Sequence, residues 1–357
     1  MPHSKGILSL MKESGFECLP CARRNIDFER LTEYDESREH QTEMPFERPA
    51  FDGNRRRIPS YPEDVPSILR YFLDGSRRTY RVSDVIVDGR YFPVVAGQVG
   101  VAIVERHHDG HVRPVKRFCG LRNVLALPER CNPSDLRSLE DTIREKGHHP
   151  FQVLSYTIKK DRDPVDLAVA KIMDMMHGLE IQALAQMTDE NMLGMERMLV
   201  IDGALRFRRR FQITQFRNVL GLSKSFQASM TVGKGTKKQS IGSIAARLDR
   251  GYRSQVFRTE DQGRTLGVWY LRMRDARLMS DPLQGTVKLE RYAVDNEVSD
   301  GFDGDQVDTI SHFVVQERNV TPYSSDSRWA SHIYPIYLAE QYIKSSFMSN
   351  MKFVGLF

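Results

Sequence analysis

Two apolar runs in this chain end in an aspartate followed by a glycine. The first run covers residues 67–73 and ends at Asp74, and the second covers residues 198–201 and ends at Asp202. Aspartate is a poor strand residue and glycine permits a sharp change of direction, so each carboxylate is predicted at the end of a buried strand. If the two strands are adjacent and parallel, both carboxylates lie at one edge of the sheet, where ligands bind in open α/β sheets.

A third pair of this kind, Asp88-Gly89, serves as an internal comparison. It separates two β-rich runs, residues 79–87 and 91–104. Because a matching strand follows at once, the pair is predicted to form a two-residue hairpin turn, and Asp88 is not a candidate site residue. Together with the strand that ends at Asp74, these runs predict a meander of three consecutive strands.

The remaining pattern predicts an α/β chain with additional β-rich elements. Strands are expected at about 119–124, 151–158, 218–225, 254–258, 266–274 and 286–294, and helices at about 133–147, 163–187, 240–250, 304–318 and 335–349. The helix at 163–187 is expected to begin with Asp163 as its N-cap and Pro164 in its first position. Its apolar residues recur at steps of three and four, and Glu180 falls on this apolar stripe.

Residues 1–64 are predicted to form a helix followed by an extended arm, and residues 65–357 a single larger domain. Prolines at 45, 49, 59, 62 and 66 argue against a compact unit near the start of the chain. The favoured interpretation is a surface wrap that packs on the main domain. The alternative is an arm that binds nucleic acid or a partner, since it carries Arg55-Arg56-Arg57.

Composition indicates a globular, cytoplasmic protein. The chain has 357 residues, of which 40% are hydrophobic and 28% charged. It has no run of the roughly 18 apolar residues that a membrane span requires. The apolar stretch at the start of the chain is too short for a signal peptide, and charged residues follow it too soon. Four cysteines are too few for a disulfide scaffold in a chain of this length.

A net charge of +5 is by itself weak evidence for binding to nucleic acid, but basic residues gather just after Asp202. The candidates for DNA binding are Arg206, Arg208, Arg209, Arg210, Lys234, Lys237 and Lys238. The first four alternate with Phe207 and Phe211. Arginines neutralise phosphates and aromatic rings stack on exposed bases. The alternative is a charged face with two core aromatics.

The acidic residues Asp74, Glu180 and Asp202 form the central candidate site. A carboxylate on an apolar face must be paired or neutralised, and oxygen-rich sites suit Mg²⁺ or Mn²⁺. Two such ions about 4 Å apart can bind the attacking and leaving oxygens of a phosphodiester. Lys224, near the end of the strand at 218–225, could hold the phosphate as a point charge. The alternative is three unrelated acids, two in turns and one in a salt bridge, beside a solvated lysine.

Other motifs are less informative. Cys18-Leu-Pro-Cys21 is half of a zinc site without a second pair. The loop that starts at Gly233 lacks the spacing of a phosphate-binding loop. A serine-hydrolase elbow of the G-x-S-x-G type is absent from the sequence.

The order of these motifs resembles the NurA nuclease family. The similarity covers residues 65–350 and includes the two Asp-Gly motifs, the helix with Glu180, the segment Gly221-Leu-Ser-Lys-Ser225, and Tyr334-Pro335 before a helix. It implies an RNase H-like mixed sheet flanked by helices. It also implies DNA cleavage with manganese or magnesium, by a dimer docked on the hexameric ATPase HerA, in DNA repair or phage defence.

Carried over by position, Asp74, Glu180 and Asp202 match the metal-binding acids of the family, and Lys224 matches its strand-end lysine. The family usually places a histidine in the helix after Tyr-Pro, and this helix has none. The fourth ligand is therefore open, and the further candidates are His332, Tyr334 and Glu340. This departure sustains an alternative function, a catalytically weak or inactive DNA-binding subunit that regulates a partner ATPase.

The apolar C-terminal tail, residues 353–357, has two interpretations. It packs on its own domain, which is the favoured one, or it docks on another chain.

Overall fold

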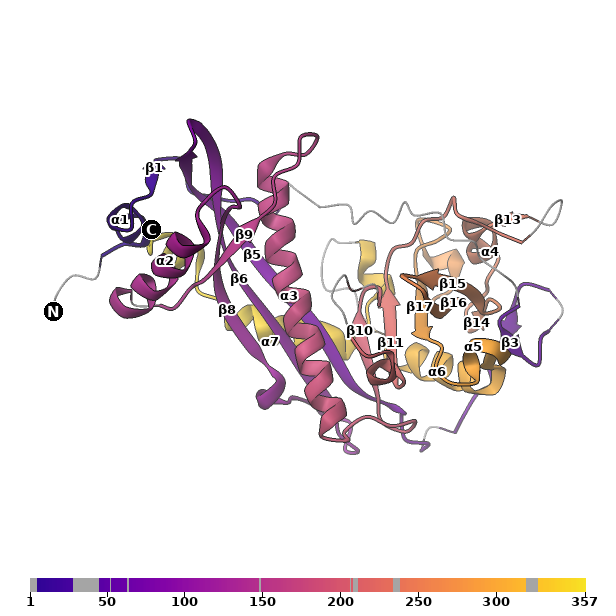
Figure 1. Cartoon of the computed structure of the whole chain (residues 1–357). Coiled ribbons are helices and arrows are strands. Elements are labelled where there is room, and N and C mark those ends of the chain that lie inside the picture. Colours follow the sequence, from indigo (N-terminus) through magenta and orange to yellow (C-terminus); the bar gives the residue numbers. More distant parts are fainter. Residues whose placement is uncertain are drawn as a thin grey trace.

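The computed structural model describes residues 5–27, 45–51, 53–62, 64–147, 149–205, 207, 211–233, 238–318 and 327–357. Within these residues, one large mixed sheet is flanked by helices (Figure 1). Its main path runs through β4 (Arg56–Arg57), β14 (Tyr252–Arg253), β16 (Arg264–Arg272), β17 (Thr286–Tyr292), β11 (Val219–Ser223), β10 (Met198–Asp202), β5 (Leu69–Val87), β6 (Arg90–Arg106), β8 (Gly120–Pro128) and β9 (Gln152–Tyr156). The coarse prediction of an α/β fold is therefore confirmed.

Short strands extend this sheet or form small separate pairs. The extensions are β1 (Glu17–Leu19) and β2 (Arg24–Asn25) on β5, β7 (Val112–Pro114) on β6 and β15 (Phe257–Asp261) on β16. The separate pairs are β3 (Glu47–Arg48) with β18 (Phe302–Asp303), and β12 (Thr231–Val232) with β13 (Gln239–Ser240). The helices are α1 (Ile7–Glu13), α2 (Pro133–Lys146), α3 (Pro164–Asp189), α4 (Ile241–Ala246), α5 (Glu297–Asp300), α6 (Gly304–Gln316), α7 (Tyr334–Ser345) and α8 (Asn350–Val354).

The hairpin and the long helix form as the sequence predicts. Asp88 and Gly89 join β5 to β6 with φ angles of 52° and 70°, the left-handed conformation that a two-residue hairpin turn requires. Asp163 caps α3 by accepting a hydrogen bond from the backbone N–H of Val165 at 2.8 Å, and Pro164 is its first residue.

The prediction that a strand ends at Asp74 is wrong. β5 continues through Asp74 and Gly75 to Val87, and these two residues pair with Ala102 and Val101 of β6. An antiparallel ladder of this length satisfies the backbone on both sides of Asp74, which outweighs the poor strand propensity of aspartate. The strand that ends is its parallel neighbour β10, at Asp202.

The two faces of the sheet are covered by different helices. α3 packs on β5, β6 and β8 and lies in front of these strands in Figure 1. α7 packs on the other face of β5 and β6 and lies behind them. Side chains of a strand alternate between faces. On β5, Leu73 belongs to the apolar cluster of α3, and Phe72 belongs to the cluster that contains Ile336 of α7. Asp74 has the parity of Phe72 and therefore lies on the α7 face.

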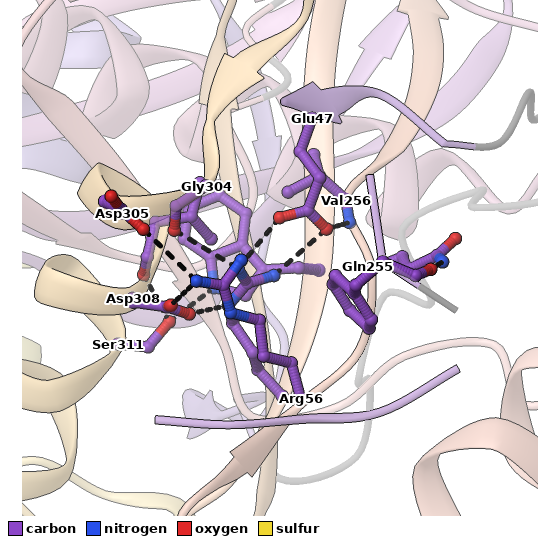
Figure 2. A network of polar contacts seen from close by, with 12 residues as sticks. Glu47, Arg56, Gln255, Val256, Gly304, Asp305, Asp308 and Ser311 are labelled. Carbon is purple, nitrogen blue, oxygen red and sulfur yellow. Dashed lines mark hydrogen bonds and ion pairs between the residues drawn. The ribbon is translucent and has the colours of Figure 1, made fainter. Parts of the chain in front are cut away.

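The described residues between 45 and 58 pack on the sheet as a wrap would. Their anchor is the guanidinium of Arg253, which is fully buried and binds Glu47 of β3 through two hydrogen bonds of 3.1 and 2.8 Å. The same group donates to Asp308 of α6 at 2.5 Å, and Arg56 contacts the other oxygen of Asp308 at 2.8 Å (Figure 2). An ionic network thus joins this segment to β14 and α6.

The C-terminal tail packs on its own chain. Phe353 and Phe357 are buried against Phe151, and the carbonyl of Leu356 accepts a hydrogen bond from Ile7 of α1 at 2.8 Å. Of the two interpretations of the tail, this is the favoured one. Among the described residues, no helix has the length and apolar character needed to cross a membrane.

Candidate functional site

Asp74 and Asp202 lie side by side at the edge where β10 ends. β10 is parallel to β5, with Ile201 opposite Leu73, so the two aspartates are each one residue further along neighbouring strands. This is the adjacency that the two Asp-Gly motifs predict. Val200 belongs to the same apolar cluster as Phe72, so Asp202 also lies on the α7 face.

Lys224 completes an ion pair at this edge. β11 is parallel to β10, and Lys224 directly follows it. Its Nζ donates a hydrogen bond to Asp202 Oδ2 at 2.7 Å, and the side chains are only 13% and 23% exposed. Burial disfavours the ammonium, but the charge of Asp202, their hydrogen bond and the charge of Asp74 oppose it, so the pKa of Lys224 is raised. The lysine is therefore charged at neutral pH.

Asp74 is a buried carboxyl with too little positive charge around it. Desolvation raises its pKa well above the ordinary value, and the neighbouring charge of Asp202 raises it further. Lys224 opposes this effect, whereas Glu340 and Glu180 add to it. Ser76 Oγ donates a long hydrogen bond of 3.4 Å to Asp74 Oδ2. Carboxylates thus outnumber cations at this site.

Two of the three further candidates lie close enough to act on this cluster. Burial lowers the pKa of His332 to about 4, with Lys224 adding to the effect and Asp202 opposing it, so its imidazole is neutral at pH 7. Glu340 lies on α7 and is paired with Lys344. Tyr334 is 45% exposed at the start of α7, and the hydrogen bond described for it joins its backbone N–H to Glu317.

Glu180 approaches from the opposite side, on α3. Gly75 follows Asp74 and therefore faces α3, and a Cβ atom added there would overlap Glu180 Oε1. The absence of a Cβ atom at Gly75 leaves room for this carboxylate, and the chain does not make the predicted change of direction, because β5 continues past Gly75. In the described part of the chain, no side chain donates a hydrogen bond to Glu180. Burial, and then the charge of Asp202, raise its pKa to about 8.

Replacement of Glu180 by glutamine should stabilise the metal-free protein at high pH. The pKa of Glu180 is raised from 4.5 to about 8, so the folded protein keeps a proton that the unfolded chain releases in this window. The free energy of unfolding of the wild type should therefore fall as pH rises through it. We expect Glu180→Gln to exceed the wild type by roughly 3–5 kcal/mol at pH 9 and to match it at pH 4.

Urea unfolding in EDTA at both pH values measures this difference. Glu190→Gln, at the exposed end of the same helix, is the matched control and should be neutral at both. A Glu180→Gln protein that is less stable than the wild type at pH 9 would contradict the assignment of Glu180 as an uncompensated carboxyl.

The donor chemistry of the cluster suits a hard divalent cation, but its geometry is incomplete. Asp74, Asp202 and Glu180 supply carboxylate oxygens, the ligands that Mg²⁺ and Mn²⁺ prefer. The excess of carboxylates is the charge pattern that such an ion would neutralise. Across the described ranges, however, no three acidic, histidine or cysteine side chains converge closely enough to hold one ion. Lys224 is the cation at Asp202.

The predicted DNA-binding residues lie largely outside the described residues. These are Arg206, Arg208, Arg209, Arg210, Lys234 and Lys237. Lys238 is described and is exposed just before β13. Phe207 is buried and packs with Phe211 and Phe216 at centroid distances of 6.1 and 5.5 Å. Phe207 is therefore a core aromatic and does not present a free face for a base.

Sequence reasoning missed a polar row on β17. Lys288, Glu290 and Tyr292 alternate along this strand, and all three are buried on the α3 face. The signal was present in the sequence, because two charges within a predicted core strand require partners.

The comparisons with known proteins leave the family open. Neither the scan against protein-family models nor the search of curated proteins found a match for this chain.

Proposed function

We propose that this protein is a metal-dependent deoxyribonuclease that hydrolyses phosphodiester bonds. The observation that carries the proposal is the junction of β5, β10 and β11. There, Asp74 and Asp202 lie on adjacent parallel strands, Lys224 binds Asp202 at 2.7 Å, and Glu180 contacts Gly75 from the other face. Buried acids with one paired lysine are the groups that phosphodiester cleavage requires.

Each residue has a defined role in this proposal. Asp74 and Asp202 would hold one or two Mn²⁺ or Mg²⁺ ions, and Glu180 would contribute negative charge from α3. When bound, such ions activate water and stabilise the attacking and leaving oxygens. The water oxygen bonds to phosphorus, the bond to the leaving oxygen breaks, and that oxygen takes up a proton. Lys224, which is charged and largely buried, would hold a phosphate oxygen by its ammonium.

The fold supports the finer interpretation as an RNase H-like core. β5, β6 and β8 are neighbouring antiparallel strands, and β5 carries Asp74. The meander expected over residues 67–104 has two strands and not three, because β5 runs unbroken from Leu69 to Val87. The resemblance to the NurA family further implies a homodimer that acts with a HerA-type hexameric ATPase in DNA end processing or phage defence. These partners are part of the proposal.

The test is cleavage of labelled single- and double-stranded DNA by the purified protein. It is run with Mn²⁺, Mg²⁺ or EDTA, with and without a HerA-type ATPase. We expect metal-dependent cleavage that falls at least about 100-fold in Asp202→Asn, since even partners of metal ligands cost 10- to 100-fold. The control is Asp88→Asn. Asp88 belongs to the Asp-Gly pair at the hairpin tip, and this variant should cleave DNA normally. Full activity of Asp202→Asn would refute the site.

A second candidate is a DNA-binding subunit that regulates a partner ATPase without cleaving DNA. The observation that favours it is the lack, among the described side chains, of three metal ligands that converge, with Glu180 on the other face of the sheet from Asp74. Calorimetric titration with Mn²⁺ separates the two candidates. Binding that is lost in Asp202→Asn supports the nuclease, whereas DNA binding without Mn²⁺ binding supports the regulatory subunit.

A further inference from the structure

The chain that leaves Asp202 turns back and crosses the α3 face of β11. Gly203 has a φ of 106°, which favours glycine, and its N–H donates to the carbonyl of Leu222 at 2.8 Å. Leu205 then lies directly over Gly221. A Cβ atom added at Gly221 would lie only 2.8 Å from Leu205 Cγ and 3.1 Å from the carbonyl oxygen of Gly203. Both glycines are thus required by this crossing.

Two side chains of β17 bind the crossing segment through the backbone N–H and the backbone carbonyl of Leu205. The backbone N–H of Leu205 donates to Glu290 Oε1, and the hydroxyl of Tyr292 donates to the carbonyl of Leu205 at 2.5 Å. Glu290 and Tyr292 are fully buried. Lys288 Nζ lies 3.0 Å from Glu290 Oε2 and neutralises its charge. We name Glu290, Tyr292 and the bound Leu205 backbone the β17 clamp.

The clamp is more than a strand needs for its own stability. An apolar pair at these positions would fill the same core without burying a carboxylate and an ammonium. The Glu290 carboxylate accepts the hydrogen bond of the Leu205 N–H. Without it, this backbone N–H would be buried at the crossing with no acceptor. Leu205 lies three residues after Asp202 and directly before the basic segment that starts at Arg206.

We propose that Glu290 and Tyr292 are positioning residues that fix Asp202 at the sheet edge. This inference rests on the proposed function for its consequence in metal binding. The hydrogen bonds of the clamp hold the backbone after Asp202 at two points, so its carboxylate stays opposite Asp74. Loss of either bond lets the turn at Gly203 relax and separates the two aspartates.

The test compares Tyr292→Phe with Tyr156→Phe in the full chain. Tyr156 is an apt control because it is equally buried and its hydroxyl also donates to a backbone carbonyl, that of Pro93, at 2.9 Å. It lies on β9, at the far end of the sheet. Each variant removes one hydroxyl. Hydrogen exchange of the peptide spanning residues 199–207 and calorimetric affinity for Mn²⁺ are measured for both.

We expect Tyr292→Phe to speed exchange in this peptide and to weaken Mn²⁺ binding about 10-fold, as loss of a partner of a metal ligand does. Tyr156→Phe should change neither. Glu290→Gln, whose amide oxygen still accepts from Leu205, should keep most of the Mn²⁺ affinity, whereas Glu290→Met should lose it. Equal effects of the two tyrosine variants, or faster exchange with unchanged Mn²⁺ affinity, would overturn the proposal.

The exchange measurement separates this inference from the proposed function. If the wild type neither binds Mn²⁺ nor cleaves DNA, the nuclease proposal and the positioning of a metal ligand both fail. Faster exchange in Tyr292→Phe would then show only that the hydroxyl holds the backbone of Leu205, and the positioning proposal would still fail. Equal exchange in both variants would remove the clamp as well.

Discussion

Replacement of Lys224 by methionine should destabilise the metal-free protein by about 3 kcal/mol at pH 8, and Mn²⁺ should restore most of this loss. The lysine is the cation at Asp202, and its removal leaves that carboxylate next to Asp74 without compensation. The pKa of Lys224 is raised in the folded protein, so its contribution is fully present below the ordinary value of 10.5 and pH 8 lies inside this window.

Thermal unfolding of both proteins with EDTA or saturating Mn²⁺ provides the measurement. Lys344→Met is the matched control, since Lys344 pairs with Glu340 close to the same cluster but is more exposed. An exposed pair of this kind contributes about 0.5 kcal/mol or less. An Mn²⁺-induced shift that is the same in Lys224→Met, Lys344→Met and the wild type would show that the ion does not bind at the carboxylates.

The sequence predicted the two strands and their junction because local and global signals agree there. Each apolar run is bounded by an Asp-Gly pair, and parallel pairing of the two runs is sufficient to bring Asp74 and Asp202 together. The cap of α3 is equally local, because Asp163 accepts a hydrogen bond from the first turn of this helix. Such features depend on a few adjacent residues.

The features that could not be predicted depend on contacts between distant segments. Asp74 stays within β5 because the backbone of β6 continues to pair with β5 beyond it. The strand propensity of a single residue does not take such pairing into account. Gly75 was interpreted as a turn residue, whereas its role is the approach of Glu180, about a hundred residues away. The face on which each acid lies also follows from how α3 and α7 cover the sheet.

The network around Arg253 illustrates the same limit, because its partners are spread over three segments. Glu47 lies in the proline-rich arm, Arg253 in β14 and Asp308 in α6, and the sequence pattern does not indicate that the three side chains meet. The guanidinium and both carboxylates are buried. Removal of one member of such a network leaves charges that neither water nor protein compensates.

We therefore expect Arg253→Met to lower the free energy of unfolding by about 3–5 kcal/mol at pH 7. Glu47 and Asp308 would remain buried without the guanidinium. Of these two carboxylates, Arg56 contacts only that of Asp308. The triple replacement of Glu47, Arg253 and Asp308 by apolar residues of similar volume should recover much of the loss, because the uncompensated charges are gone. The control is Arg277→Met. The ion pair of Arg277 with Asp275 is at the surface, so its loss should leave the free energy of unfolding nearly unchanged. Urea unfolding gives these values. If Arg253→Met and Arg277→Met cost the same, the buried network does not hold the arm to the sheet.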